Sequence, residues 1–220
     1  SPSRFLAQSV TRALRRDLDI AIIPHPFPAS DARVSSEREP RHLVCVGRLQ
    51  AVKGVLQLVH ACHRLWEHGE RFRLTMVGGD APYAPGDTTL GTYLRQRYGR
   101  WIDGGRLELV GRVDHDVALQ HMRRAAAVVI PSLFENFPNT CLEAMAMGQV
   151  VMATHSGGQA EIIGNDGSAG FLFDWERPGD FERQLVRVLD LGEAERRAIG
   201  ERARARLRAA RSQDRSAMRR

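Results

Sequence analysis

From residue 41 onward, short and continuous apolar runs alternate with longer stretches whose apolar residues recur at helical spacing. Continuous apolar runs of this length are typical of strands buried on both faces of a parallel sheet. We expect strands over residues 42–46, 72–77, 106–110, 126–130, 150–154 and 170–173. The amphipathic stretches predict helices over residues 52–67, 88–98 and 114–124, from residue 139, around residue 161, and over residues 181–191 and 193–210. Such alternation favours an α/β fold with a doubly wound, Rossmann-like parallel sheet.

The first 40 residues have a different pattern. An apolar stripe predicts a helix through residue 19, and Ser3 could cap its start. We expect a short strand at residues 20–23. Three prolines in residues 24–28 exclude regular structure there, and the polar residues 29–41 indicate a linker. We therefore divide the chain into residues 1–40, 41–191 and 192–220.

The stretch from Pro131 to Gly148 carries the candidate chemistry. Glu135 lies in a polar loop after a buried strand, Asn139 is a good helix N-cap, and Glu143 is expected in the first turn of the helix that ends at Gly148. A helix N-terminus after a strand favours anions. Carboxylates beside it can accept hydrogen bonds from hydroxyl groups. The stretch therefore predicts a ligand that carries phosphates between hydroxyl-bearing sugars.

The predicted topology brings further polar loops to the same place. Ligands of open parallel sheets bind beyond the carboxyl ends of the strands. The segments expected at that edge are Gly47-Arg48, Gly78-Gly79-Asp80, Gly111-Arg112-Val113, Glu135 to Asn139, and Ser156-Gly157-Gly158.

Composition narrows the class of protein. The chain has 220 residues with 43% hydrophobic residues, and we find no stretch long enough to span a bilayer and no opening signal peptide. Cys45, Cys62 and Cys141 lie in apolar runs without paired spacing, so we expect buried free thiols in a reducing compartment. The histidines and acids show no metal-ligand spacing. We therefore expect no metal and no cofactor.

The net charge of +6 comes largely from arginines after residue 195. A solvated helix with a frayed tail is one interpretation, and contact with anionic lipid headgroups is the alternative. The tail has neither interleaved aromatic residues nor a nucleic-acid motif, so we expect no nucleic-acid partner.

The two acids of the central stretch are separated by seven residues within Pro-Ser-x-x-Glu-x-Phe-Pro-Asn-x-x-x-Glu-Ala-Met-Ala-x-Gly, and they resemble the E-x7-E signature of retaining GT-B glycosyltransferases. The run resembles the group 1 family (family 4) in particular. Val46-Gly47-Arg48-Leu49 with Lys53-Gly54 is similar to the phosphate-binding residues of that family. The resemblance implies that Arg48 and Lys53 bind the diphosphate of a nucleotide-sugar and stabilise it as it leaves.

The resemblance also implies roles in the central stretch. Glu143 would accept hydrogen bonds from the ribose, and Glu135 would hold a hydroxyl of the donor sugar. The backbone of Asn136, Phe137, Pro138 and Asn139 would face the sugar, the amides of Thr140 and Cys141 would face phosphate, and Leu142 would pack beside the ribose. Arg112 and Val113 would hold the base through backbone contacts. Ser156-Gly157-Gly158 with Glu161 is similar to a Gly-Gly-x-x-Glu turn of the family, where we assign the glycines to shape.

The match covers residues 41–210, and residues 1–28 resemble the last helix and strand of the other GT-B domain, with His25-Pro26 in place of Asn-Gly. We therefore expect the C-terminal, donor-binding half of a GT-B enzyme, and weak or no transfer by this chain alone. The implied partners are a nucleoside diphosphate sugar, an acceptor sugar that is lipid-linked or small, a missing N-terminal domain, and an anionic membrane surface. The implied location is cytoplasmic, with peripheral attachment to the inner face of the membrane left open. A non-catalytic nucleotide-sugar module and a nucleotide-sugar epimerase of the same fold are the alternatives.

Overall fold

The computed structural model describes residues 1–23, 38–83 and 87–217, with side chains through residue 210. Its main sheet has the strand order β5-β2-β1-β6-β7-β8, and every neighbouring pair is parallel. The strands are β1 (His42–Val46), β2 (Arg73–Val77), β5 (Leu107–Gly111), β6 (Ala127–Ile130), β7 (Val151–Thr154) and β8 (Phe171–Phe173). The chain runs outward from β1 to β5, returns to β6 and continues to β8. The doubly wound sheet is thus confirmed, and its order reverses between β1 and β6, where ligands of such sheets bind.

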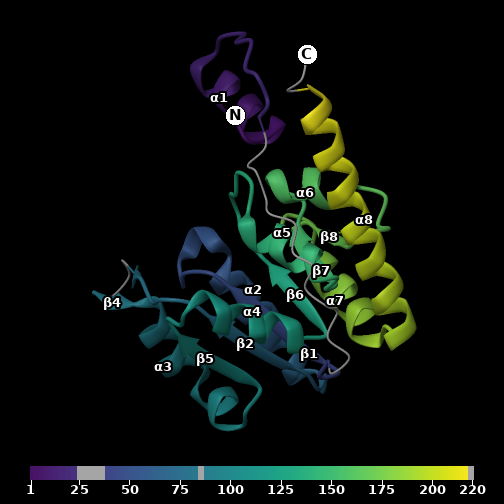
Figure 1. Cartoon of the computed structure of the whole chain (residues 1–220). Helices are drawn as coiled ribbons and strands as arrows, with labels where there is room; N and C mark the ends of the chain where they lie inside the picture. Colours follow the sequence, from purple (N-terminus) through teal and green to yellow (C-terminus); the bar gives the residue numbers. More distant parts are fainter. Residues whose placement is uncertain (24–37, 84–86, 218–220) are drawn as a thin grey trace.

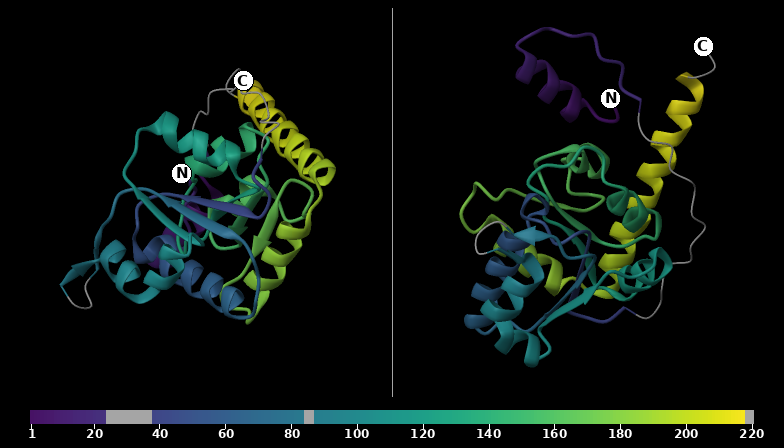
Figure 2. Two further views of the ribbon diagram at one scale, coloured as in Figure 1. Left: turned by 90° about the horizontal axis from the view of Figure 1, so that it is seen from below. Right: turned by 90° about the vertical axis from the view of Figure 1, so that its left-hand side faces the viewer.

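Helices cover both faces of the sheet (Figures 1 and 2). On one face α2 (Val55–Glu67), α3 (Leu90–Asp103) and α7 (Asp180–Asp190) pack over the first apolar cluster. On the other face α4 (His115–Arg124), α5 (Asn139–Ala146), α6 (Gly158–Ile163) and α8 (Glu193–Ala217) pack over the second. A small antiparallel pair, β3 (Pro82–Tyr83) and β4 (Thr88–Thr89), precedes α3.

The apolar residues of each strand divide between the two clusters because successive side chains of a strand point to opposite faces. In β1, Leu43 and Cys45 belong to the first cluster and Val44 to the second. In β6, Val129 belongs to the first, while Val128 belongs to the second. This two-sided burial explains why the strands read as continuous apolar runs.

Several predicted boundaries were wrong. Residues 20–23 form no strand: Ile23 donates to the Ser1 carbonyl at 2.7 Å, and a strand needs a longer paired neighbour. The helix predicted from residue 52 begins at Val55, after the 3₁₀ turn η1 (Ala51–Lys53), because Gly54 takes a left-handed conformation. The predicted proline-rich stretch and most of the linker lie outside the described residues.

The helix of the central stretch also differs from prediction. Pro138 occupies the N-cap position of α5, so Asn139 is its first helical residue and caps nothing. Glu143 consequently lies in the second turn, and the first turn carries no acid. The predicted stop is confirmed, because Gly148 follows the helix with φ +69°.

The N-terminal helix α1 (Arg4–Leu14) lies beyond the carboxyl edge of the sheet (Figure 1). Ser3 caps it, as predicted, by accepting a hydrogen bond from the Leu6 amide. The Glu161 carboxylate on α6 accepts hydrogen bonds from the amides of Arg4 and Phe5, at 3.1 and 2.6 Å. The Phe5 ring also packs on Phe134, with 5.3 Å between centroids. Glu161 therefore fastens α1 to the rim of the sheet.

The basic helix α8 lies against α5 and α6. A Cβ atom added at Gly200 would lie 2.0 Å from the Gly148 carbonyl oxygen, so the two backbones nearly touch. Arg202 donates to the Ser168 carbonyl at 2.7 Å, and Arg206 donates to the Ile162 carbonyl at 2.9 Å. Some of the charge of α8 thus binds the chain itself, while contact with lipid stays a prediction. Within the described ranges, no helix has the length and hydropathy to cross a membrane.

Candidate nucleotide-sugar site

The loops at the carboxyl edge form a hydrogen-bonded rim. The Gly47 amide donates to Val77, the Leu49 amide to Gly79, and the Gly78 amide to Gly111, each at 2.9 Å. A Cβ atom at Gly78 would lie 2.0 Å from the Gly47 carbonyl oxygen. Glycine therefore lets the loops after β1 and β2 approach closely.

The loop after β6, residues 131–138, is anchored along most of its length. The Leu133 amide donates to the Val52 carbonyl at 3.0 Å, which ties the loop to η1. Thr154 at the end of β7 donates its hydroxyl proton to the Ser132 carbonyl at 2.7 Å. The Gly158 amide donates to the Glu135 carbonyl at 3.0 Å. These bonds hold the backbone of Glu135 in one position.

Two contacts meet at the Pro131 carbonyl, where this loop begins. The Trp175 indole N–H donates to it at 3.0 Å. On another side, a Cβ atom at Gly54 would lie only 1.8 Å from the same oxygen. Gly54 therefore serves twice, because it supplies the left-handed turn before α2 and the space that Pro131 occupies.

A pocket of about 80 Å³ opens between the ends of β1 and β6. The predicted site residues in its lining are Gly47, Arg48, Lys53, Glu135, Pro138 and Thr140. Lys53 and Glu135 form an ion pair inside it, and their side chains are 32% and 19% exposed. The exposed Arg48 has no ion-pair partner among the residues that the structure describes. The pocket thus combines two cations, one acid and the start of a helix.

The start of α5 is only partly open to a ligand. The Cys141 amide already donates to the Pro138 carbonyl at 3.0 Å. The side chains of Cys141 and Leu142 are buried in the second apolar cluster, and burial raises the pKa of the Cys141 thiol well above its usual range. Thr140 is the half-buried residue of this turn that lines the pocket.

Glu143 lies outside this pocket, on the side of α5 that faces α4. Its carboxylate is half-buried, and burial raises its pKa, which the nearby His115 partly offsets. His115 Nε2 lies 3.7 Å from Glu143 Oε1. No motif in the sequence singles out His115, although its place directly after Gly111-Arg112-Val113-Asp114 puts it on the rim.

The remaining predicted site residues lie around the small pocket and the Glu143–His115 pair. Arg112 is exposed, and Val113 packs partly against the second cluster. Asn136 and Phe137 are half-buried in the loop, and Asn139 is exposed at the start of α5. The Asn136 Oδ1 atom is buried and lacks a hydrogen-bond partner within the described part of the chain. Such an acceptor is costly unless a ligand or water satisfies it.

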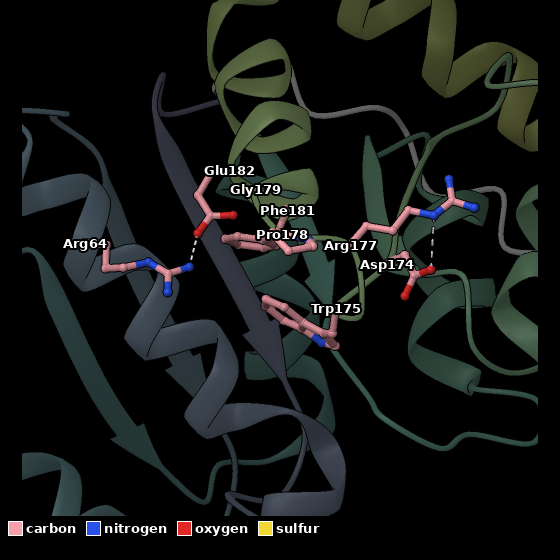
Figure 3. A pocket seen from close by; sticks show the side chains of 8 residues that line it. All are labelled: Arg64, Asp174, Trp175, Arg177, Pro178, Gly179, Phe181 and Glu182. Carbon is pink, nitrogen blue, oxygen red and sulfur yellow. Dashed lines mark hydrogen bonds and ion pairs between the residues drawn. The ribbon is translucent and has the colours of Figure 1, made fainter.

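A larger pocket, of about 540 Å³, lies between α2 and the loop after β8 (Figure 3). It contains none of the predicted site residues. Its charged groups are paired with each other, Arg64 with Glu182 and Arg177 with Asp174. Trp175 lines it and links it to Pro131. Over the described residues, no group of three or more potential metal ligands gathers in this pocket or elsewhere.

The family model described as "Glycosyl transferases group 1" matches residues 40–191 of this chain. The chain belongs to the group 1 glycosyltransferases. The predicted family is thereby confirmed, and the match spans the whole sheet and the rim described above.

Relatives of this glycosyltransferase chain support the assignment. It is 32% identical over 183 residues to the sucrose synthase of Acidithiobacillus caldus, covering 77% of this chain and 22% of that protein. Its fold is similar to the solved sucrose-phosphate synthase of Thermosynechococcus elongatus, with a TM-score of 0.74, 23% identity, and coverage of 94% of this chain and 52% of that one. The solved Anabaena Alr3699/HepE in complex with UDP and glucose matches with a TM-score of 0.60 and 25% identity, over 76% of this chain and 43% of that one.

The chain therefore spans about half or less of the length of these relatives.

Proposed function

We propose that this chain binds a nucleoside diphosphate sugar as the donor half of a retaining glycosyltransferase. The observation that carries the proposal is the pocket between β1 and β6. Arg48, Lys53 and Glu135 line it together with Thr140 from the first turn of α5. Two cations and a helix N-terminus suit a diphosphate, and a carboxylate suits sugar hydroxyls. The Anabaena relative in complex with UDP and glucose supports the same ligand class.

The donor would span the rim. Its diphosphate would lie against Arg48, Lys53 and Thr140. Its sugar would lie against Glu135 and the side-chain oxygen Oδ1 of Asn136, which has no partner among the described residues. Its ribose would reach Glu143, and its base the loop that contains Arg112 and Val113. As the bond to the sugar breaks, Arg48 and Lys53 would stabilise the charge that develops on the leaving diphosphate.

The acceptor, a lipid-linked or small sugar, would be held mainly by a second domain. The greater length of the relatives is the support for this part of the proposal. This chain alone would therefore bind donor and transfer it slowly or not at all.

Calorimetric titration with UDP, GDP and ADP tests the donor site. We expect one nucleotide to bind, and both Arg48→Ala and Glu143→Ala to weaken it by tenfold or more, since each removes a charged hydrogen bond worth about 1.5–3 kcal/mol. Arg64→Ala is the matched control, because this arginine lies in the other pocket. Binding that survives both site variants, or binding that Arg64→Ala weakens equally, would refute the assignment.

A further inference from the structure

The Lys53–Glu135 ion pair joins two groups that the proposed function assigns to different parts of one ligand. Lys53 is assigned to the diphosphate, and Glu135 to the sugar. In the structure the two side chains form an ion pair with each other. A nucleoside diphosphate sugar can bind Lys53 or Glu135 only by breaking this ion pair and taking the place of the other residue.

The backbones on both sides of the pair are fixed. Lys53 ends η1, which the Leu133 amide binds through the Val52 carbonyl at 3.0 Å. Glu135 is held through its own carbonyl by the Gly158 amide at 3.0 Å. The two side chains are only 32% and 19% exposed, so solvent screens this pair less than a pair between two exposed side chains. It competes with a ligand more effectively for that reason.

The other cation of the pocket is in a different state. Arg48 is exposed and is not engaged by any acid among the described residues. An arriving diphosphate can meet Arg48 at once. It can take Lys53 only by displacing Glu135, whose negative charge would then face the phosphates unpaired.

A sugar on the diphosphate changes this balance. Its hydroxyl groups can donate to the Glu135 carboxylate, whose side chain is only 19% exposed and depends on partners in the protein or ligand. With those bonds formed, Lys53 is released to the phosphates. A diphosphate without the sugar to be transferred places no hydroxyl groups at Glu135. The carboxylate then either stays in its ion pair with Lys53 or remains as an uncompensated charge.

We propose that Glu135 withholds Lys53 from a bare diphosphate and releases it to a sugar-bearing one, so that the pair makes the site discriminate between donor and spent nucleotide. The inference rests on the proposed donor site. After transfer, loss of the sugar would return Glu135 to Lys53 and promote release of the nucleotide.

The test is the ratio of two affinities in Glu135→Gln, which removes the charge and keeps the shape. Titrations would use UDP with UDP-glucose, ADP with ADP-glucose, GDP with GDP-mannose, and inorganic pyrophosphate alone. We expect Glu135→Gln to bind the bare diphosphate and pyrophosphate about fivefold more tightly at low salt, with a smaller gain or a loss for the sugar-bearing ligand. Thermal unfolding would establish that the variant folds.

Glu182→Gln is the matched control. It removes the same charge from an ion pair with Arg64, and its side chain is 21% exposed against 19% for Glu135. An unchanged ratio in Glu135→Gln, an equal change in Glu182→Gln, or no pyrophosphate binding by either variant would overturn the inference. Tighter pyrophosphate binding without binding of any nucleotide would instead overturn the donor-site proposal and leave the competition for Lys53 standing.

Discussion

The contact between Gly54 and Pro131 predicts that one added methyl group disturbs the site from outside it. Gly54 has φ +69°, and a Cβ atom there would lie 1.8 Å from the Pro131 carbonyl oxygen. Gly167 has the same φ of +69° with nothing within 4 Å of its Cβ position. Replacing each by alanine therefore separates the cost of the backbone conformation from the cost of the contact.

The magnitudes follow from these two terms. A left-handed conformation costs a residue with a Cβ roughly 1–2 kcal/mol, and overpacking adds roughly 1–3 kcal/mol. We expect Gly167→Ala to lower the free energy of unfolding by about 1 kcal/mol and Gly54→Ala by about 3 kcal/mol. For a chain of this size those losses lower Tm by about 3 °C and about 9 °C.

Differential scanning calorimetry measures the two losses. The NMR resonance of the Trp175 indole N–H gives a local readout. This N–H group donates to the Pro131 carbonyl, which Gly54→Ala would displace. The resonance should shift in Gly54→Ala and stay in place in Gly167→Ala. Equal losses of Tm in the two variants, or an unmoved Trp175 resonance, would refute the reasoning.

Three other predictions concern charges. Burial and Arg73 lower the pKa of His42 to about 4, so stability should fall by at most about 3 kcal/mol as pH drops from 6.5 towards 4, and His42→Gln should flatten that part of a Tm-against-pH curve. Burial raises the pKa of Glu143, so its carboxylate costs stability increasingly as pH rises from the ordinary pKa of a carboxyl group through the raised one; Glu143→Gln should raise Tm at pH 7 and leave it unchanged at pH 4. Glu161→Ala should speed hydrogen exchange at the Arg4 and Phe5 amides at least tenfold while exchange in β1 stays constant, and unchanged amides would count against the role of Glu161.

The sheet could be predicted because its strands carry their own signal. Burial on both faces makes β1, β6 and β7 continuous apolar runs, and the parallel topology then places the loops after them on one edge. The lining of the small pocket, including Arg48, Lys53 and Glu135, follows from that placement.

The details of the site depend on contacts between distant segments, which no local pattern contains. The start of α2 is displaced because Gly54 turns the chain against Pro131, 77 residues later. Proline displaces Asn139 from the cap of α5, since Pro138 needs no partner for a missing amide hydrogen and holds the extended conformation of that position. The pairing of His115 with Glu143 likewise joins the start of α4 to α5, two helices that only the fold brings together.

The close approach of Gly200 to Gly148 sets an unequal tolerance along α8 to sequence drift over evolutionary time. An outward-facing arginine can be replaced by lysine, glutamine or glutamate with little effect on stability, because its side chain is exposed to solvent. Position 200 has no such freedom, since any side chain there meets the Gly148 carbonyl and would lift the helix off α5. Descendants of this chain should therefore keep the inconspicuous glycine while the outward-facing arginines of α8 change.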